Sequence, residues 1–395
     1  MDWGSSRAAN TSDMAGQCPR YPFQWPSQVD QPAEFAVVHA RPALPVVLPS
    51  GDRAWLVTRY HDVRALLTDP RISKNRNRPD MARMTPPAGG PTKHFANQVE
   101  MDPPGHPRMR RLVAKAFTAA RVEKLRPRVR EIVAELLSTM EAQGGPVDLS
   151  AAFAHPLSIR VICELLGVPV EEQTQFASLR EPPWAYMAEL IERKRRAPSD
   201  DLISALIEVT DAADGRLSEA ELHWWSTVLL LAGYETSAHQ MLSAVVMLLS
   251  HPRQLARLRE CPALLESAVE ELLRHQVVGT SLSMLRYVTA DIEVGGVTIP
   301  AGASVVPSLE CANHDPAVFP NPMELDLARS GPQQLTFSFG RHFCVGAPLA
   351  RLELQIGLEG LLTRFPNLRL AAPLDRLCRR EDPFTQGFAG VPVNW

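Results

Sequence analysis

The chain has 395 residues, with 41 lysines and arginines against 44 aspartates and glutamates and a formal net charge of −3 at pH 7. A charge so close to zero gives no global indication of nucleic acid or of an anionic membrane, so we expect neither as a partner. Six cysteines without a CxxC pair argue against a disulfide scaffold or a zinc site, and they favour a reducing compartment.

The N-terminal segment is polar and lacks the apolar core of a signal peptide. We therefore predict a flexible N-terminal tail over residues 1–30 and a cytoplasmic protein. The rest of the chain contains no Gly/Ser-rich linker, charge block or internal repeat that would divide it. We predict that residues 31–395 form a single domain.

The first predicted elements, over residues 33–75, are a helix, a small hairpin and a second helix. The hairpin is indicated by a turn signal, PSGD at 49–52, between two short β runs. Residues 76–100 are rich in Arg, Asn, Pro and Gly and show little periodicity. An irregular loop of this length in a compact domain is often functional.

A basic helix is predicted next, with Pro107 near its start. His106 and Arg110 are four residues apart, so they lie on one face of that helix. Taken alone, the pattern is ordinary for a basic surface helix. Two or three helices with apolar stripes follow over 121–173, and the interval after them is short and interrupted by Pro182-Pro183.

The most hydrophobic stretch, 219–250, is long enough to suggest a membrane span, but polar residues in its middle argue against one. We predict a long buried helix. The small residues Ala232 and Gly233 would let a flat ligand lie against it. Glu235 next to Thr236 could relay protons, while the alternative is a threonine that bonds back to its own helical turn.

Downstream, Glu271 and Arg274 have the spacing of a helical ion pair, which is common and by itself weakly informative. The run 276–302 then changes to β character, with a turn at Gly295-Gly296. The C-terminal residues, 383–395, are predicted to form a last hairpin.

Cys344 lies in a glycine-punctuated loop just before a predicted helix that starts near Pro348. Free N–H groups and the helix dipole at that position favour a thiolate over a thiol. A lone cysteine is more often a small core residue. A thiolate held open at a helix start nevertheless suits an axial metal ligand better than a disulfide partner.

The segment 335–353 resembles the haem-binding loop of the cytochrome P450 family, and the resemblance extends from about residue 30 to Trp395. The residues of the loop that fit the family pattern are Phe337, Gly340, His342, Cys344, Gly346, Leu349 and Ala350. Ser338 stands where the family usually has another glycine, and Leu285 replaces the proline that usually precedes the position of Arg286.

The resemblance implies the P450 fold: mainly α with a small β-rich lobe (α+β), a triangular prism with haem b between the long central helix and the cysteine-loop helix. Cys344 would be the proximal thiolate, Glu235 and Thr236 would deliver protons during oxygen activation, and Glu271 and Arg274 would form a structural ion pair. The residues implied to hold the haem propionates are His106, Arg110, Arg286 and His342. Further haem contacts are implied for Phe337, Gly346, Ala232 and Gly233. The candidates for the substrate pocket are Leu231, Ser281, Leu282, Gln386 and Phe388.

The implied activity is that of a monooxygenase of the soluble actinobacterial type that tailors natural products. It would activate dioxygen with electrons from a soluble ferredoxin and its reductase, and it would hydroxylate or epoxidise a small to medium organic substrate. One alternative is an oxidase of the same scaffold that couples aromatic carbons without inserting oxygen. Another is a haem-thiolate binding or gas-sensing protein, although the Glu235-Thr236 pair argues against a sensor.

The family normally places two helices and a connecting loop over the substrate channel. This chain is short around Pro182-Pro183, either because the lid is reduced or because a segment is absent from the sequence.

Overall fold

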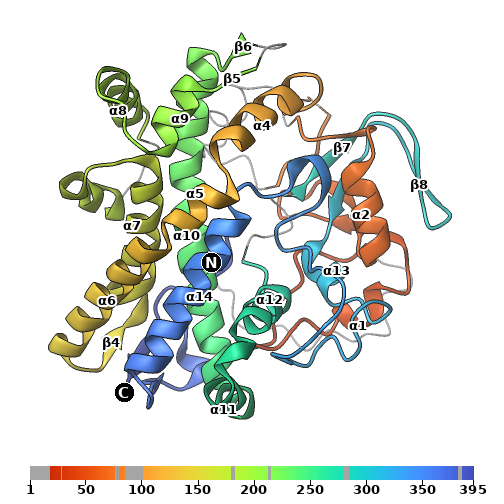
Figure 1. Ribbon diagram of the computed structural model, residues 1–395. Coiled ribbons are helices and arrows are strands. Elements are labelled where there is room, and N and C mark those ends of the chain that lie inside the picture. Colours follow the sequence, from red (N-terminus) through yellow and green to blue (C-terminus); the bar gives the residue numbers. More distant parts are fainter. Residues whose placement is uncertain are drawn as a thin grey trace.

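The computed structural model describes the chain from residue 18 onward (Figure 1). The residues it describes are 18–27, 29–75, 78, 80–84, 101–178, 183–211, 215–278, 284–380 and 385–395.

Helices dominate the described chain and form one side of the molecule, while the largest sheet lies in a lobe on the other side (Figure 1). The α-helices are α1 (Phe35–Val38), α2 (Tyr60–Thr68), α4 (Gly105–Ala116), α5 (Ala119–Lys124), α6 (Arg126–Gln143), α7 (His155–Leu166), α8 (Trp184–Arg196), α9 (Leu202–Glu208), α10 (Glu219–Ser250), α11 (Pro252–Glu260), α12 (Leu265–His275), α13 (Leu309–Asn313) and α14 (Ala347–Arg364). The shorter helical turns are the π-helix η2 (Ser150–Ala154) and the 3-10 helices η3 (Val170–Ser178), η4 (Pro262–Leu264), η6 (Gly340–His342) and η7 (Leu374–Arg376).

The strands belong to small sheets. They are β1 (Ala43–Val47), β2 (Arg53–Val57), β3 (Ile72–Ser73), β4 (Val147–Asp148), β5 (Thr210–Asp211), β6 (Gly215–Arg216), β7 (Arg286–Val288), β8 (Ile292–Val294), β9 (Val297–Ile299), β10 (Ser304–Pro307), β11 (Arg369–Leu370) and β12 (Pro392–Asn394). The largest sheet has the order β1-β2-β10-β7-β3, in which β1 and β2 form the predicted hairpin and β10 runs parallel to β2. The predicted α+β class with a small β-rich lobe is confirmed.

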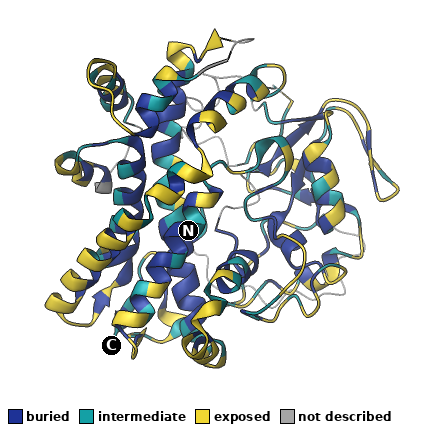
Figure 2. Cartoon of the chain, viewed as in Figure 1, coloured by how far each residue is buried: buried dark blue, intermediate teal, exposed yellow. Residues whose placement is uncertain are grey.

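Helix α10 runs through the middle of the molecule, as predicted for residues 219–250 (Figure 2). It begins at a capping box, in which the Ser218 side chain accepts from the Glu221 backbone N–H and the Glu221 carboxylate accepts from the Ser218 N–H. Helices α7 and α14 pack against it, and its C-terminal half is buried almost without interruption. This central helix is therefore held rigidly by its neighbours, and its middle turns form a rigid surface. Among the described residues, no helix combines the length and apolarity needed to cross a membrane.

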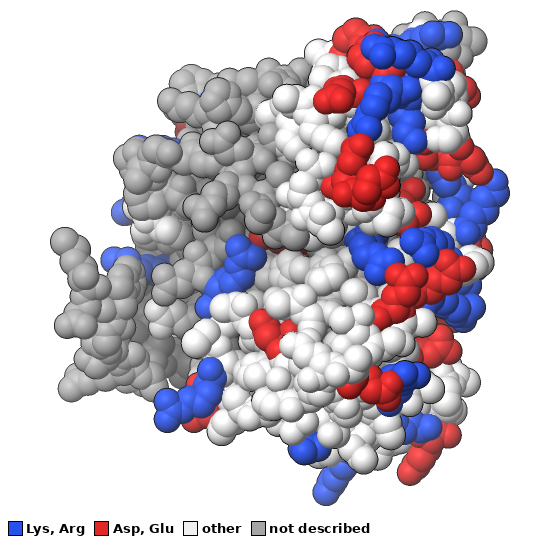
Figure 3. Space-filling view, turned by 90° about the vertical axis from the view of Figure 1, so that its left-hand side faces the viewer, with Lys and Arg blue, Asp and Glu red and all other residues white. Residues whose placement is uncertain are grey.

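The surface over the helical side carries charges of both signs (Figure 3). Basic and acidic side chains are interspersed there, and many form ion pairs, such as Arg195 with Glu219 at 2.5 Å and Arg128 with Glu164 at 3.2 Å. This mixture agrees with the near-zero net charge of the whole chain.

The described part of the N-terminal segment differs from the predicted tail. Tyr21 and Phe23 are 2% and 7% exposed, their rings meet edge to face, and the Tyr21 N–H donates to the Val47 carbonyl at 3.0 Å. Burial of these aromatic side chains outweighs the entropy of ordering the segment. The tail prediction is therefore wrong for the stretch around Tyr21 and Phe23, and residues 1–17 lie outside the described chain.

The shortened interval after α7 contains the 3-10 helix η3 followed by α8, which starts directly after Pro183. The two elements are joined by Arg193, which donates to both oxygens of Glu172 at 2.7 and 2.8 Å, and by Tyr186, which donates to the same carboxylate. These hydrogen bonds hold the pKa of Glu172 at about 2. An ionised Glu172 thus ties η3 to α8, while Pro182 lies outside the described residues.

Candidate active site

Cys344 lies between η6 and α14, in a loop that requires unusual backbone angles. Ser338 and Gly340 have φ of +65° and +71°, which lie in the left-handed region that favours glycine. A Cβ at Gly340 would also come within 3.2 Å of the Leu67 carbonyl oxygen. The Cys344 N–H donates to the Phe337 carbonyl at 2.9 Å, and this bond closes the loop around the sulfur.

The serine that departs from the family pattern therefore occupies a position that demands a left-handed conformation. This geometry explains why glycine is usual there, and it shows that Ser338 adopts the same conformation with its side chain largely buried. Among the described residues, the Ser338 hydroxyl has no hydrogen-bond partner.

The thiol of Cys344 is held by the start of α14. The backbone N–H groups of Gly346 and Ala347 bond to the sulfur, and Arg110 contributes a positive charge, all of which favour the thiolate. Burial outweighs these effects and raises the pKa of the Cys344 thiol above its ordinary value. Burial acts against the N–H donors expected at this helix start, which are in place. A metal ion that displaces the proton would benefit from them.

Beside this loop lies a basic cluster, which we define as His106, Arg110, Arg286, His342, Lys74 and Arg341. The rings of His106 and His342 are 4.1 Å apart between centroids. Burial, and then the charges of Lys74 and Arg110, lower the pKa of His106 to about 4. The pKa of His342 is lowered well below its usual range by burial and by the charges of Lys74, Arg286 and Arg341.

The cluster has the chemistry of an anion site. The buried Nδ1 of His106 has no hydrogen-bond partner among the described residues. Cations that depress the pKa of neighbouring histidines would be stabilised by carboxylates placed among them. The structure brings the four residues predicted to hold propionates into this one cluster. Sequence reasoning missed Lys74, which belongs to no motif, and Arg341, which lies within the cysteine loop but was given no role.

Two residues near the middle of α10 are exposed although much of the helix is buried: Ala232 and Thr236, one turn apart. The Thr236 hydroxyl donates to the Ala232 carbonyl at 2.7 Å, which is the back-bond weighed as the alternative interpretation. The hydroxyl oxygen can still accept a hydrogen bond. A Cβ at Gly233 would lie 2.7 Å from the Ile162 side chain, so the close packing of α10 on α7 explains this glycine.

The carboxylate of Glu235 has a partner that the sequence did not indicate. Its Oε1 accepts from the Arg380 guanidinium at 2.8 Å, and both side chains are 35% exposed. Arg380 lies 145 residues further along the chain and belongs to no recognisable motif, so only the fold reveals the contact.

The Glu271–Arg274 pair is almost fully buried in α12. Two hydrogen bonds of 2.7 and 2.9 Å join the side chains, and Arg274 also donates to the Asn313 and Pro322 carbonyls. Arg329, which sequence reasoning missed, donates to both oxygens of Glu271 at 3.0 Å. The Glu271 carboxylate thus joins α12 to the irregular segment around Arg329, a structural role.

The predicted pocket residues have different positions in the structure. Leu231 and Gln386 are partly buried, and the Gln386 N–H donates to the Val278 carbonyl at 2.7 Å. Phe388 is completely buried, so the prediction that it faces a substrate is wrong. Its ring packs among the side chains of the main hydrophobic core instead. Ser281 and Leu282 lie outside the described residues.

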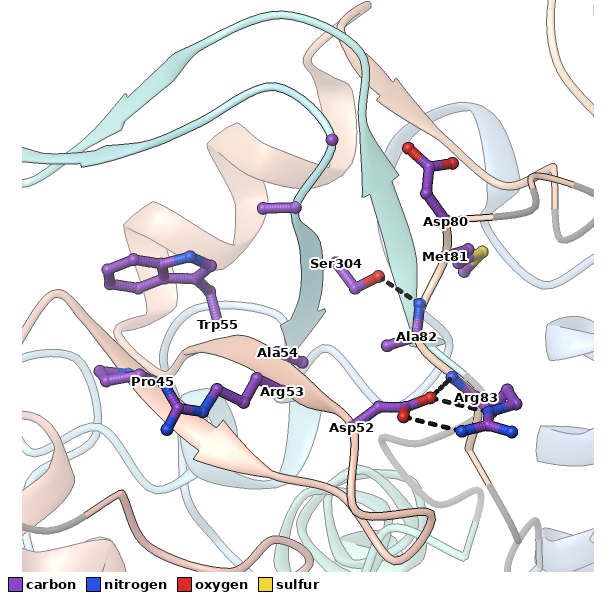
Figure 4. Close-up of a pocket in the computed structure, with 12 residues that line it drawn as sticks. Pro45, Asp52, Arg53, Ala54, Trp55, Asp80, Met81, Ala82, Arg83 and Ser304 are labelled. Atoms are coloured by element: carbon purple, nitrogen blue, oxygen red, sulfur yellow. Dashed lines mark hydrogen bonds and ion pairs between the residues drawn. The ribbon is translucent and has the colours of Figure 1, made fainter. Parts of the chain in front are cut away.

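A groove of about 760 Å³ lies elsewhere, on the β-rich lobe (Figure 4). An ion pair from Asp52 to Arg83 and a hydrogen bond from the Ala82 N–H to Ser304 fasten residues 80–84 to the sheet there. None of the predicted site residues lines this groove. The groove is formed where residues 80–84 lie on the sheet. The active site is placed at Cys344 instead, because the predicted catalytic and haem-binding residues lie there.

The central helix, the cysteine loop and the basic cluster together define a haem-thiolate protein. A cytochrome P450 family model matches residues 263–379. The chain is 43% identical over 399 residues to nocardicin C N-oxygenase from Nocardia uniformis subsp. tsuyamanensis, covering 95% of this chain and 98% of that protein. It is 44% identical over 365 residues to mycinamicin IV hydroxylase/epoxidase from Micromonospora griseorubida, covering 88% and 91%.

Solved structures agree with the sequence relatives. The mixed-function P450 MycG superposes with a TM-score of 0.85 at 41% identity, covering 96% of this chain and 100% of that chain. The LnmA cytochrome P450 hydroxylase from Streptomyces atroolivaceus superposes with a TM-score of 0.86 at 39% identity, covering 95% and 100%. The chain belongs to the cytochrome P450 family. It is a P450 monooxygenase that uses haem b and dioxygen to oxidise an organic substrate.

Proposed function

We propose that this monooxygenase receives its electrons from a soluble ferredoxin and its reductase in the cytoplasm, and that it tailors a natural product. The single observation that carries the site assignment is the position of Cys344, whose sulfur accepts from two N–H groups at the start of α14 beside the basic cluster. A soft thiolate with N–H donors suits an iron ligand, and the cluster suits two carboxylates.

Each residue then has a distinct task. Bound haem supplies the oxygen-activating chemistry. Cys344 would ligate its iron, and the residues that would bind its propionates are His106, Arg110, Arg286 and His342. Ala232, Gly346 and Phe337 would border its flat face, with Gly233 keeping α10 tight against α7. Glu235 would take up a proton from water and release it toward the Thr236 hydroxyl, which would donate its own proton in the oxygen-activating step and regain one from Glu235.

The class of substrate is proposed from the relatives. The names of nocardicin C N-oxygenase and mycinamicin IV hydroxylase/epoxidase state that these relatives act on nocardicin C and on mycinamicin IV. We expect mycinamicin-like or nocardicin-like compounds to shift the haem spin state of the purified protein, which a spectral titration would measure. A response to small apolar compounds alone would contradict this substrate class.

Replacing Thr236 by alanine should lower the product formed per electron by about tenfold or more, and raise hydrogen peroxide release, because proton delivery fails. Product and peroxide would be measured with ferredoxin, reductase and a substrate found in the titration. Thr227→Ala is a matched control, since Thr227 is on the same helix and makes the same back-bond, to the His223 carbonyl at 2.9 Å. Equal coupling in the two variants would remove Thr236 from the relay.

A further inference from the structure

The Arg380 guanidinium joins two residues of α10. One nitrogen, Nη1, lies 2.8 Å from Oε1 of Glu235 and 2.7 Å from Nε2 of His239. Glu235 and His239 are four residues apart and therefore share one face of the helix. Nη1 carries two hydrogens, so it can donate one to each partner.

This arrangement fixes the hydrogen-bonding state of both partners. A guanidinium cannot accept a hydrogen bond, so Nε2 of His239 must be the acceptor and the imidazole carries its proton on Nδ1. The Glu235 carboxylate likewise accepts, through Oε1. His239 is completely buried, whereas Glu235 and Arg380 keep about a third of their side-chain surface exposed. The contacts among Glu235, Arg380 and His239 therefore connect the solvent-exposed surface with the buried protein interior.

Arg380 is held in place by its own backbone. Its N–H donates to the Gly387 carbonyl at 2.9 Å, beside the antiparallel bridge of Arg379 with Phe388, and we call this paired segment the C-terminal hairpin. A Cβ at Gly387 would lie 2.4 Å from Nδ1 of His239, so the hairpin backbone rests directly against the imidazole ring. Only glycine permits this approach. Two independent contacts, one through the guanidinium and one through Gly387, thus dock the hairpin on the same histidine.

Behind His239 lies His155, whose ring meets it edge to face at 5.2 Å between centroids. The Nδ1 of His155 bonds to the Ser150 hydroxyl at 3.0 Å. Burial lowers the pKa of His155, and the charge of Arg380 acts in the same direction. The cation in direct contact with the Glu235 carboxylate is the Arg380 guanidinium, at 2.8 Å.

We propose that Arg380 is a positioning residue for proton delivery, which orients the Glu235 carboxylate by sharing one guanidinium nitrogen between Glu235 and His239. The proposal rests on the proposed relay role of Glu235. A partly exposed ion pair contributes little to stability, so its effect falls on orientation. Glu235 still exchanges its proton with water and Thr236, and Arg380 keeps all its own protons.

The test compares Arg380→Gln with Arg380→Lys, which keeps a charge, and with Arg376→Gln, an exposed arginine of the same C-terminal segment. In Arg380→Gln we expect several-fold lower coupling, a larger solvent deuterium isotope effect on product formation, and a shifted carbon monoxide stretching band in the reduced complex. Arg380→Lys should recover part of each change, and Arg376→Gln should behave as wild type. The infrared band reports local electrostatics without turnover, and a merely structural role would leave it unmoved.

Glu235→Gln separates the two proposals. If Glu235→Gln keeps wild-type coupling, the relay role of Glu235 fails. If Glu235→Gln uncouples while Arg380→Gln matches Arg376→Gln in coupling and infrared band, the role of Arg380 is overturned. The double variant should be no more uncoupled than Glu235→Gln alone, because Arg380 acts through that carboxylate. Additive losses would likewise overturn the proposal.

Discussion

The variant Cys344→Ser is expected to lose the thiolate-specific absorption band of the reduced carbon monoxide complex completely. A serine hydroxyl in that loop would receive the N–H groups of Gly346 and Ala347 but would not ionise at neutral pH, so the iron would lack its sulfur ligand. Monooxygenase activity should vanish with the band. The measurement is a difference spectrum of the dithionite-reduced protein with and without carbon monoxide.

Cysteine replacement elsewhere provides the control for this experiment. Cys261 is exposed at the end of α11, outside the site, and Cys261→Ser should keep the full band. Haem content of both variants would be measured separately, because loss of haem alone also removes the band. An unchanged spectrum in Cys344→Ser would overturn the assignment of Cys344 as the iron ligand.

The elements predicted most accurately are those that depend on local sequence pattern. The helix predicted over 219–250 is α10 with the same bounds, because a capping box starts it and apolar residues cover nearly all its faces. The hairpin around 49–52 also forms, since its turn signal separates two β runs. Local sequence rules fail at residues 18–27. We predicted that these residues belong to a flexible tail, but their aromatic side chains Tyr21 and Phe23 are buried against β1.

Within the site, motif residues were predictable and their long-range partners were not. Arg329 and Arg380 bind Glu271 and Glu235 across 58 and 145 residues, and nothing near either arginine in the sequence marks it. The pKa shift of Cys344 was also beyond the sequence, because the N–H groups at the helix start lower this pKa and burial raises it, and the balance depends on packing. Spacing shows which groups can meet, while the fold sets their electrostatic environment.

One buried acid lies outside the catalytic machinery altogether. Glu353 on α14 is 1% exposed and accepts from the Ser158 hydroxyl of α7. Burial raises its pKa to about 8, against an ordinary value of 4.5, although the Ser158 bond acts in the opposite direction. The side chain is therefore mainly protonated in the folded protein at neutral pH.

This raised pKa makes stability depend on pH. The unfolded chain releases the Glu353 proton near pH 4.5, whereas the folded protein holds it until about pH 8. The contribution of Glu353 is fully present below pH 4.5 and is lost as the pH rises to about 8, at about 1.4 kcal/mol per pH unit within that window. The total loss is several kcal/mol, a large fraction of a typical folding free energy.

We expect Glu353→Gln to remove this loss, because the amide fills the same space and never ionises. Urea unfolding followed by circular dichroism at pH 5, 6.5 and 8 should give similar stabilities at pH 5 and a variant that is several kcal/mol more stable than wild type at pH 8. Glu359→Gln, an exposed glutamate on the same helix, should follow the wild-type curve. A constant offset between Glu353→Gln and wild type across the three pH values would show that Glu353 ionises normally, and that the α7–α14 interface accommodates its charge.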